Sequence, residues 1–409
     1  MSADTCFKKY GGRRIMAKQS IKDRVAIIGV GCSKFGEQWE KNAEDLLIEA
    51  VYEAYEDAGI KDPNEEIDAG WVGNQYYFTG LAGCTLADAI KLYGKPMTRV
   101  ENFCASGSDS FRNACYAVAS GVCEIALATG VEKLLDEGGA GLPGFREFGH
   151  PTLPLPSAPA MFSMTATRAF HEYGWTKEDL ARVAVKNHKN GAKHPKAHFR
   201  KPVDLETVMK APMIADPLGR FDCCAMSDGA AAIIIASPEV AKSYKHSNDY
   251  VLVKANAIAV ETMAPWYKQT YGFTTFTSTV KAAKQAYHEA GITDPKTQID
   301  FAEVHDCFTI TELMNCESLG FSDKGKAAQD LKDGRFNIDG PQPINPSGGL
   351  KCFGHPIGAT GCRMIYEVTK QLQGRADGYQ VKDPKVGLTH NLGGAYTVTA
   401  INILGKNDK

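Results

Sequence analysis

Residues 54–68 read AYEDAGIKDPNEEID, and residues 286–300 read AYHEAGITDPKTQID. The two segments align without a gap, at a constant offset of 232 residues, through a helical pattern, a turn and the start of a strand. Each helical pattern ends at a glycine, Gly59 or Gly291, as is typical of a helix C-terminus. One register across three elements indicates a duplication, and its period is far too long for a solenoid repeat. The sequence therefore predicts two related halves.

Short apolar runs alternate with helical patterns over the rest of the chain, which is typical of an α/β fold with a central sheet. Strands are expected at residues 24–30, 67–72, 98–103, 123–129, 230–236 and 396–403. One helix is expected over residues 43–59, and another begins after Cys104. We therefore predict two α/β halves that pack as pseudo-symmetric sheets.

The domain organisation follows from the duplication and from a Gly- and Pro-rich stretch at residues 138–163. We expect a disordered leader at residues 1–22, a first half at residues 23–275 and a second half at residues 276–409. A loop domain at about residues 135–217 is inserted in the first half. Long irregular excursions of this kind usually cover an active site or have another functional role.

The composition excludes several classes of function. The 409 residues carry a net charge of −2 and are 44% hydrophobic, which gives no sign of nucleic-acid or anionic-membrane binding. No apolar run is long enough to cross a membrane, and the first residues lack the apolar core of a secretory signal. The 12 cysteines include no C-x-x-C pair, which favours reduced thiols in the cytoplasm over disulfides or a metal site. Basic residues between 186 and 201 either approach the phosphates of a nucleotide-like cofactor or form a solvated surface loop.

Cys104 follows a strand-like run that ends at Phe103, and the small residues after it open a helical pattern. A thiol at a helix N-terminus lies in a positive field, which lowers its pKa and favours the nucleophilic thiolate. The helix amides can hold a developing oxyanion, and the small neighbours admit a substrate carbonyl. The alternative is a buried, inert cysteine, which is the usual fate of free cysteines. Residues 100–121 alone leave both interpretations open.

Three segments of the second half carry reactive groups: residues 303–308 (EVHDCF), 345–361 (NPSGGLKCFGHPIGATG) and 389–394 (THNLGG). Duplication places loops from both halves around one pseudo-twofold axis. A nucleophilic thiol needs a basic partner, and His355 at a helix start is a candidate, although histidines in glycine-rich loops are more often structural. His305 is a second candidate donor. Cys307 lies two residues further on and therefore points to the same side of an extended segment.

In this order, the N-x-C-A-S-G, HDCF, N-P-S-G-G and G-H-P-I-G-A-T-G motifs resemble those of the thiolase superfamily. The resemblance spans residues 24–405, including the duplication and the inserted loop domain. It implies a duplicated thiolase fold with a layered α/β/α/β/α core. It also implies an acyl-CoA C-acyltransferase that cleaves a 3-oxoacyl-CoA with CoA, or catalyses the reverse Claisen condensation, through an acyl-enzyme on Cys104. Coenzyme A is then a substrate, with no covalently bound cofactor and no metal.

The resemblance implies a role for each matching residue. Cys104 is acylated, and His355 takes its proton and then helps to bind the thioester oxygen. His305 stands where ordinary thiolases place an asparagine that holds a water in the first oxyanion hole, to which His355 also contributes. The amides of Cys104 and Gly393 form the second hole, around the acyl-enzyme carbonyl. The residues expected to bind substrate are Ser227, Gly354 and Asn391.

One difference from ordinary thiolases indicates which branch of the superfamily the chain resembles. Ordinary thiolases carry a second catalytic cysteine in a C-terminal C-x-G, where this chain has Asn391. Cys307 of the HDCF motif matches the residue that serves as acid and base in the sterol-carrier-protein-type thiolases. The chain is therefore similar to that branch, without the fused lipid-carrier domain of some members. Decarboxylating ketosynthases of the same fold carry H-G-T-G-T where this chain has HDCF, and intact reactive residues argue against a non-catalytic scaffold subunit.

The substrate and the partners are left open. Thiolases of this branch in bacteria and archaea often work with a small zinc-ribbon/OB-fold protein in trans, and the family implies a homodimer or a dimer of dimers. A short, a long, and a bulky aromatic or dicarboxylic acyl chain are all compatible with the motifs. Several side chains either shape an acyl pocket or pack the loop domain: Phe145, Phe148, Met161, Phe162, Met164 and those of residues 263–271.

Overall fold

The computed structural model describes residues 7–10, 13–16, 20–76, 80–137, 142, 157–262 and 271–407. The first half contains β3 (Ala26–Cys32), α1 (Ala43–Ala58), α2 (Pro63–Glu66), β4 (Ala69–Gly73), α3 (Ala82–Ile90), β5 (Met97–Val100), α4 (Ser106–Ala119), β6 (Ile125–Lys133), β9 (Asp228–Ala236) and α8 (Pro238–Ala241). The loop domain contributes α5 (Ala158–Tyr173), α6 (Lys177–Gly191), α7 (Leu205–Met209), β7 (Met213–Ala215) and β8 (Leu218–Gly219). The second half contains β10 (Val251–Val260), α9 (Thr277–Ala290), α10 (Pro295–Gln298), β11 (Phe301–Val304), α11 (Thr309–Ser318), α12 (Ala327–Lys332), α13 (Gly349–Phe353), α14 (Thr360–Leu372), β12 (Val386–Gly393) and β13 (Val398–Lys406).

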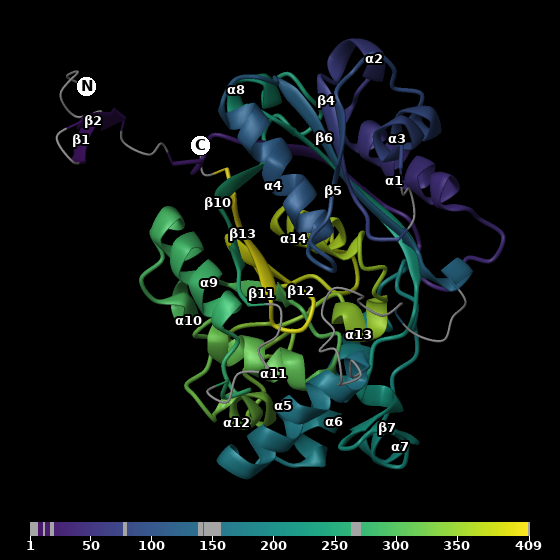
Figure 1. The fold of residues 1–409 in the computed structure, drawn as a ribbon, viewed down its shortest axis with the longest axis vertical. Helices are drawn as coiled ribbons and strands as arrows, with labels where there is room; N and C mark the ends of the chain where they lie inside the picture. The colour runs from purple at the N-terminus through teal and green to yellow at the C-terminus, as the bar shows by residue number, and fades with distance from the viewer. Residues whose placement is uncertain are drawn as a thin grey trace.

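A nine-stranded sheet runs through the molecule in the order β11-β12-β13-β10-β3-β9-β6-β4-β5. Its two halves meet where β10 pairs with β3, through Val251 with Ile27 and Leu252 with Ala26. The helices α4 and α14 contact each other and strands of both halves, so they form the central layer (Figure 1). The helix α1 covers the outer face of the first half, and α9 covers that of the second. The layered α/β/α/β/α core is therefore confirmed, with the two half-sheets joined edge to edge.

The repeat found in the sequence is also a repeat of structure. The helix α1 ends at Gly59 (φ 81°) and α9 ends at Gly291 (φ 79°), in the left-handed conformation that favours glycine. The offset of 232 residues also relates α2 to α10 and β4 to β11. Asp68 accepts hydrogen bonds from the amides of residues 124 and 125, and Asp300 accepts them from the amides of residues 385 and 386. Each repeat therefore holds the start of its neighbouring parallel strand in the same way.

Three residues of the basic stretch, Lys186, His188 and His194, are buried, and two of them contact the second half. Lys186 Nζ lies 3.0 Å from Glu312 Oε1, and His194 Nε2 lies 3.0 Å from Glu367 Oε1. His188 is buried as well. For these three basic residues, both phosphate contact and a solvated loop are wrong predictions. Lys186 and His194 instead pair carboxylates that α11 and α14 carry inside the molecule, because a buried carboxylate needs a partner.

Some predictions concern residues that the structure does not describe. Phe145, Phe148 and residues 263–270 lie outside the described residues. Phe162 is described and buried, and its ring stacks on Phe308 with 4.7 Å between the centroids. Two short strands, β1 (Phe7–Tyr10) and β2 (Arg13–Met16), pair antiparallel within the predicted leader, and the domain boundaries stay predictions. None of the described helices is both long and apolar enough to span a membrane.

Candidate active site

Cys104 lies in a tight turn between β5 and α4. Phe103 has a positive φ of 52°, an unusual conformation for an aromatic residue, and it turns the chain sharply before the helix. The Ser106 hydroxyl donates to the Phe103 carbonyl (2.5 Å) and accepts a hydrogen bond from the Asn102 amide (3.0 Å). These bonds hold the backbone on both sides of Cys104, so the thiol has a fixed position at the start of α4.

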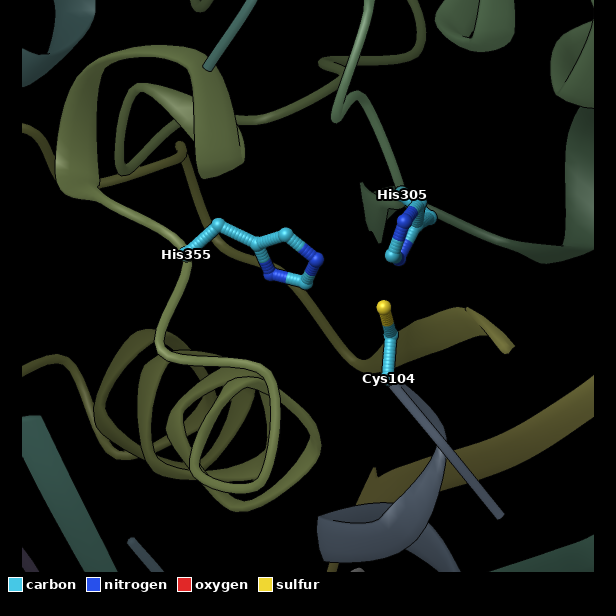
Figure 2. Close-up of side chains that lie close together, drawn as sticks. All are labelled: Cys104, His305 and His355. Atoms are coloured by element: carbon cyan, nitrogen blue, oxygen red, sulfur yellow. The ribbon is translucent and has the colours of Figure 1, made fainter. Parts of the chain in front are cut away.

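Cys104, His305 and His355 converge, although 201 and 251 residues of chain separate the histidines from the cysteine. The donor atoms of their side chains all lie within 4.8 Å of one another. The two imidazole rings meet edge to face with 5.0 Å between their centroids, and the Cys104 sulfur points into the space between them (Figure 2). All three residues are buried. A thiol and two imidazoles are also a donor set that zinc accepts, so a site without metal stays a prediction.

The hydrogen bonds of His355 fix which of its nitrogens carries the proton. His355 Nδ1 lies 2.7 Å from Thr360 Oγ1, and Thr360 Oγ1 donates its own proton to the Pro356 carbonyl (2.9 Å). Nδ1 must therefore be the N–H donor, and Nε2 has a free lone pair with no protein partner among the described residues. Burial, assisted by the Arg363 charge, lowers the pKa of His355 to about 3, so the ring is neutral at pH 7. A neutral imidazole with a free nitrogen is a general base.

The loop that carries His355 is held by buried carboxylates. Glu132 at the end of β6 accepts hydrogen bonds from the Gly358 amide (3.1 Å) and from Asn74 Nδ2 (3.1 Å). Asp306, next to His305, accepts the amide of Leu350 in α13 (2.6 Å). The segments that carry His305 and His355 are thereby tied to each other and to the first half. Their relative position is held by buried carboxylate side chains that accept hydrogen bonds from backbone amides.

Two predicted substrate-binding residues, Ser227 and Gly354, are neighbours beside this loop. A Cβ atom on Gly354, which has a φ of 115°, would lie 2.8 Å from Ser227 Oγ. Ser227 Oγ is also 2.8 Å from His198 Nδ1. The structure places Ser227 against Gly354, which directly precedes His355, and their contact with a substrate stays a prediction.

His305 follows β11 and is held on three sides. Its amide donates to His390 Nδ1 (3.4 Å), and its carbonyl accepts a hydrogen bond from Asn315 Nδ2 (2.9 Å). Its own Nδ1 lies 3.3 Å from Nδ2 of Asn391. Burial lowers the pKa of His305, and its closeness to His355, His390 and the Arg363 charge lowers it further, so the ring is neutral. Asn391, the third predicted substrate-binding residue, is thus directed at His305.

Cys307 lies near the three converging residues but is not one of them. Its Sγ is 4.0 Å from Thr311 Oγ1, and its carbonyl accepts the amide of Cys224 (2.9 Å). Burial raises the pKa of Cys307, and the thiols of Cys224 and Cys104 raise it further. Cys224 therefore adds a third thiol to this region. Sequence reasoning missed it, although the adjacent pair Cys223 and Cys224 just before Ser227 was a visible signal.

The predicted low pKa of Cys104 is wrong for this structure. Burial raises the pKa of the Cys104 thiol, the Cys224 thiol adds to this, and the Gly394 amide lowers it only in part by donating to the sulfur. The physical reason is that removing a thiolate from water costs more than the helix amides return. Cys104 is therefore a thiol in the resting protein, and its predicted role as a nucleophile requires a base, for which His355 stays the predicted residue.

Gly393 packs directly against the turn that carries Cys104. A Cβ atom at this position would lie 2.3 Å from the Asn102 carbonyl oxygen and 3.2 Å from the Ala105 amide. Gly393→Ala is expected to lower kcat about 100-fold, because the added Cβ atom displaces the turn that carries Cys104, the predicted nucleophile. Steady-state thiolysis kinetics check this. Gly272→Ala, where a Cβ meets nothing within 4 Å, is the matched control, and equal effects of the two changes would contradict the prediction.

The neutral histidines predict how stability depends on pH. Burial lowers the pKa of His355 and of His390 from 6.5 to about 3. Between these values the unfolded chain binds protons that the folded chain excludes, so stability falls as the pH decreases from 6.5 towards 3. From pH 7 to pH 5.5 each histidine is expected to reduce the free energy of unfolding by about 1 kcal/mol. Urea titrations of the wild type and of His355→Asn check this, and an unchanged pH slope in the variant would refute it.

Two families match the chain: the thiolase N-terminal domain over residues 25–140 and 153–239, and the thiolase C-terminal domain-like family over residues 262–406. The acetyl-CoA acetyltransferase of Methanothermobacter thermautotrophicus is 40% identical, over 93% of this chain and 99% of its own length. Human sterol carrier protein 2 is 33% identical, over 92% of this chain and 71% of its own length. The benzoylsuccinyl-CoA thiolase subunit BbsB of Thauera aromatica is 31% identical, over 91% of this chain and 96% of its own length.

Solved structures also match this chain over nearly its whole length. The structure described as Ltp2-ChsH2(DUF35) aldolase matches with a TM-score of 0.84 at 26% identity, over 96% of this chain and 100% of the matched chain. Human mitochondrial 3-ketoacyl-CoA thiolase matches with a TM-score of 0.70 at 17% identity, over 95% of this chain and 100% of the matched chain, which supports the fold. The chain therefore belongs to the thiolase superfamily, in its sterol-carrier-protein-type branch, and is an acyltransferase.

Proposed function

We propose that this thiolase interconverts acetoacetyl-CoA plus CoA with two molecules of acetyl-CoA, through an acetyl-enzyme on Cys104. The observation that carries the proposal is the convergence of the Cys104 thiol with a neutral His355 that has a free lone pair. The choice of an acetyl group is supported by two archaeal relatives called acetyl-CoA acetyltransferase, at 40% and 38% identity.

In the first half-reaction, His355 Nε2 takes the thiol proton as Cys104 Sγ attacks the 3-oxo carbonyl carbon. The bond between C2 and C3 breaks, so the acetyl group stays on Sγ and acetyl-CoA leaves as its enolate. The Cys307 thiol protonates C2 and becomes a thiolate. Donor groups lower the energy of the enolate: His305 and the newly protonated His355 act on the thioester oxygen.

In the second half-reaction, CoA attacks the acetyl group on Cys104. The CoA thiol gives its proton to the Cys307 thiolate, and the departing Cys104 thiolate takes back the proton that His355 holds. The amides of Cys104 and Gly393 stabilise the tetrahedral oxyanion in both half-reactions. Each enzyme group regains its starting protonation state, because the CoA thiol proton replaces the one that Cys307 gave to C2. The products are two molecules of acetyl-CoA.

The test is thiolysis of acetoacetyl-CoA by the purified chain, together with detection of the acetyl-enzyme. Incubation with acetyl-CoA should add one acetyl group, and peptide mapping should place it on Cys104. An acetyl group on another residue, or thiolysis without any acetyl-enzyme, would contradict the proposal.

A second candidate is a thiolase for bulky 3-oxoacyl-CoA esters that needs a partner protein. Two comparisons favour it: one relative is a benzoylsuccinyl-CoA thiolase subunit, and one solved relative is described together with a DUF35 protein. A screen of 3-oxoacyl-CoA esters with varied chains and rings, on the chain alone and on any complex that co-purifies, separates the two candidates. Full activity of the isolated chain on acetoacetyl-CoA would exclude a required partner.

A further inference from the structure

Asn391 lies in β12, two residues before the end of the strand. It is completely buried and makes two side-chain hydrogen bonds. Its Oδ1 lies 3.1 Å from the Ser108 hydroxyl in the first turn of α4, and its Nδ2 lies 3.3 Å from His305 Nδ1. The asparagine therefore bridges the helix that begins just after Cys104 and the histidine opposite it.

The two hydrogen bonds of Asn391 determine which group is the donor and which is the acceptor between Asn391 and His305. Because the Ser108 hydroxyl donates to Oδ1, the amide nitrogen is the end that faces the ring. An amide nitrogen only donates, so His305 Nδ1 must accept. A neutral imidazole carries one proton, which then lies on Nε2.

We propose that Asn391 is a positioning residue that holds His305 in the Nε2–H tautomer, so that His305 donates a hydrogen bond to the thioester oxygen. The inference rests on the proposed function, since it explains how His305 is held in the tautomer that the proposed reaction needs. Thr360 holds His355 in the opposite tautomer. The two adjacent histidines are both neutral, but His355 presents a free lone pair and His305 presents an N–H. His355 can therefore act as a base, and His305 can act as a hydrogen-bond donor.

The surroundings of His305 support a neutral donor rather than an imidazolium. The charged or titratable groups near its ring are His355, His390, Arg363 and the Cys104 thiol, and none of these is an anion in the resting protein. Asn391 adds a donor without adding charge. An aspartate of the same shape would instead accept from Nδ1–H and attract a second proton, which reverses the arrangement.

The direct test is the tautomer of His305 in ¹⁵N-histidine-labelled protein, read from two-bond ¹H–¹⁵N correlation spectra. His305→Asn identifies the His305 signals among the 10 histidines. The wild type should show His305 protonated at Nε2 and His355 protonated at Nδ1. Protonation of His305 at Nδ1 would overturn the proposal, whether or not any variant folds. The spectra need no turnover, so this outcome is independent of the proposed reaction.

Kinetics of Asn391→Asp provide a second test. The variant should show His305 protonated at Nδ1 or at both nitrogens, and kcat for thiolysis should fall about 100-fold, the typical cost of losing one oxyanion donor. KM for acetoacetyl-CoA should change less than about threefold, since the donor acts mainly in the transition state. Ser108→Ala, which frees Oδ1 but keeps the amide donor, should lose less than about tenfold. A wild-type tautomer and wild-type kcat in Asn391→Asp would overturn the proposal.

Discussion

Replacing Cys104 by serine is expected to lower the rate of thiolysis about 10⁴-fold or more, because catalytic groups that act as a unit fail together. His355 has a free nitrogen beside the thiol, but a serine hydroxyl is far less acidic, so the base cannot activate it in the same way. The acetyl-enzyme should also disappear from the intact-mass spectrum after incubation with acetyl-CoA. Both measurements are needed, since loss of rate alone would not locate the nucleophile.

A matched control for this change is Cys84→Ser, because Cys84 is an exposed cysteine on α3 and is not one of the three converging residues. The control should keep full thiolysis and the acetyl-enzyme. Burial raises the pKa of Cys104, so small alkylating reagents should label exposed Cys84 at least as fast as Cys104. A CoA-based alkylating reagent should reverse this preference, and His355→Asn should remove the reversal. Acetylation of the Cys104→Ser variant at an unchanged rate would refute the assignment.

Replacing Cys307 by alanine is expected to separate the two halves of the chemistry. Acetyl transfer from acetyl-CoA to Cys104 needs no proton at carbon, so the acetyl-enzyme should still form. Thiolysis of acetoacetyl-CoA should fall about 10³-fold, within the range that a positioned acid or base contributes. Exchange of the acetyl-CoA methyl protons with deuterium should also stop, because this exchange reports the base that acts on carbon.

The neighbouring thiol supplies the control for Cys307. Cys224 donates its amide to the Cys307 carbonyl and raises the pKa of both Cys104 and Cys307, so it is the other thiol in position to move a proton. Cys224→Ala should retain methyl-proton exchange if Cys307 is the shuttle. Retained exchange in Cys307→Ala with lost exchange in Cys224→Ala would transfer the role to Cys224.

Most of the fold could be predicted from local patterns. The glycines that end α1 and α9 and the constant offset between the repeats are properties of short segments, and the structure reproduces them. The basic residues of α6 could not be interpreted in this way. A sequence pattern treats Lys186 as an exposed polar residue. Only the packing of α6 against α11 shows that it is buried and pairs with Glu312.

The candidate site also has a part that the sequence predicts and a part that only the structure shows. By itself, the sequence determined which groups are present: a cysteine at a helix start, two histidines and a second thiol in motifs of a known family. The tertiary structure decided their chemical state, because pKa values and tautomers depend on burial and on partners distant in the chain. Ser108 and Asn391 are separated by 283 positions, yet their hydrogen bond determines which nitrogen of His305 carries the proton. Burial likewise made Cys104 a thiol that needs a base, where its place at a helix start had suggested a ready thiolate.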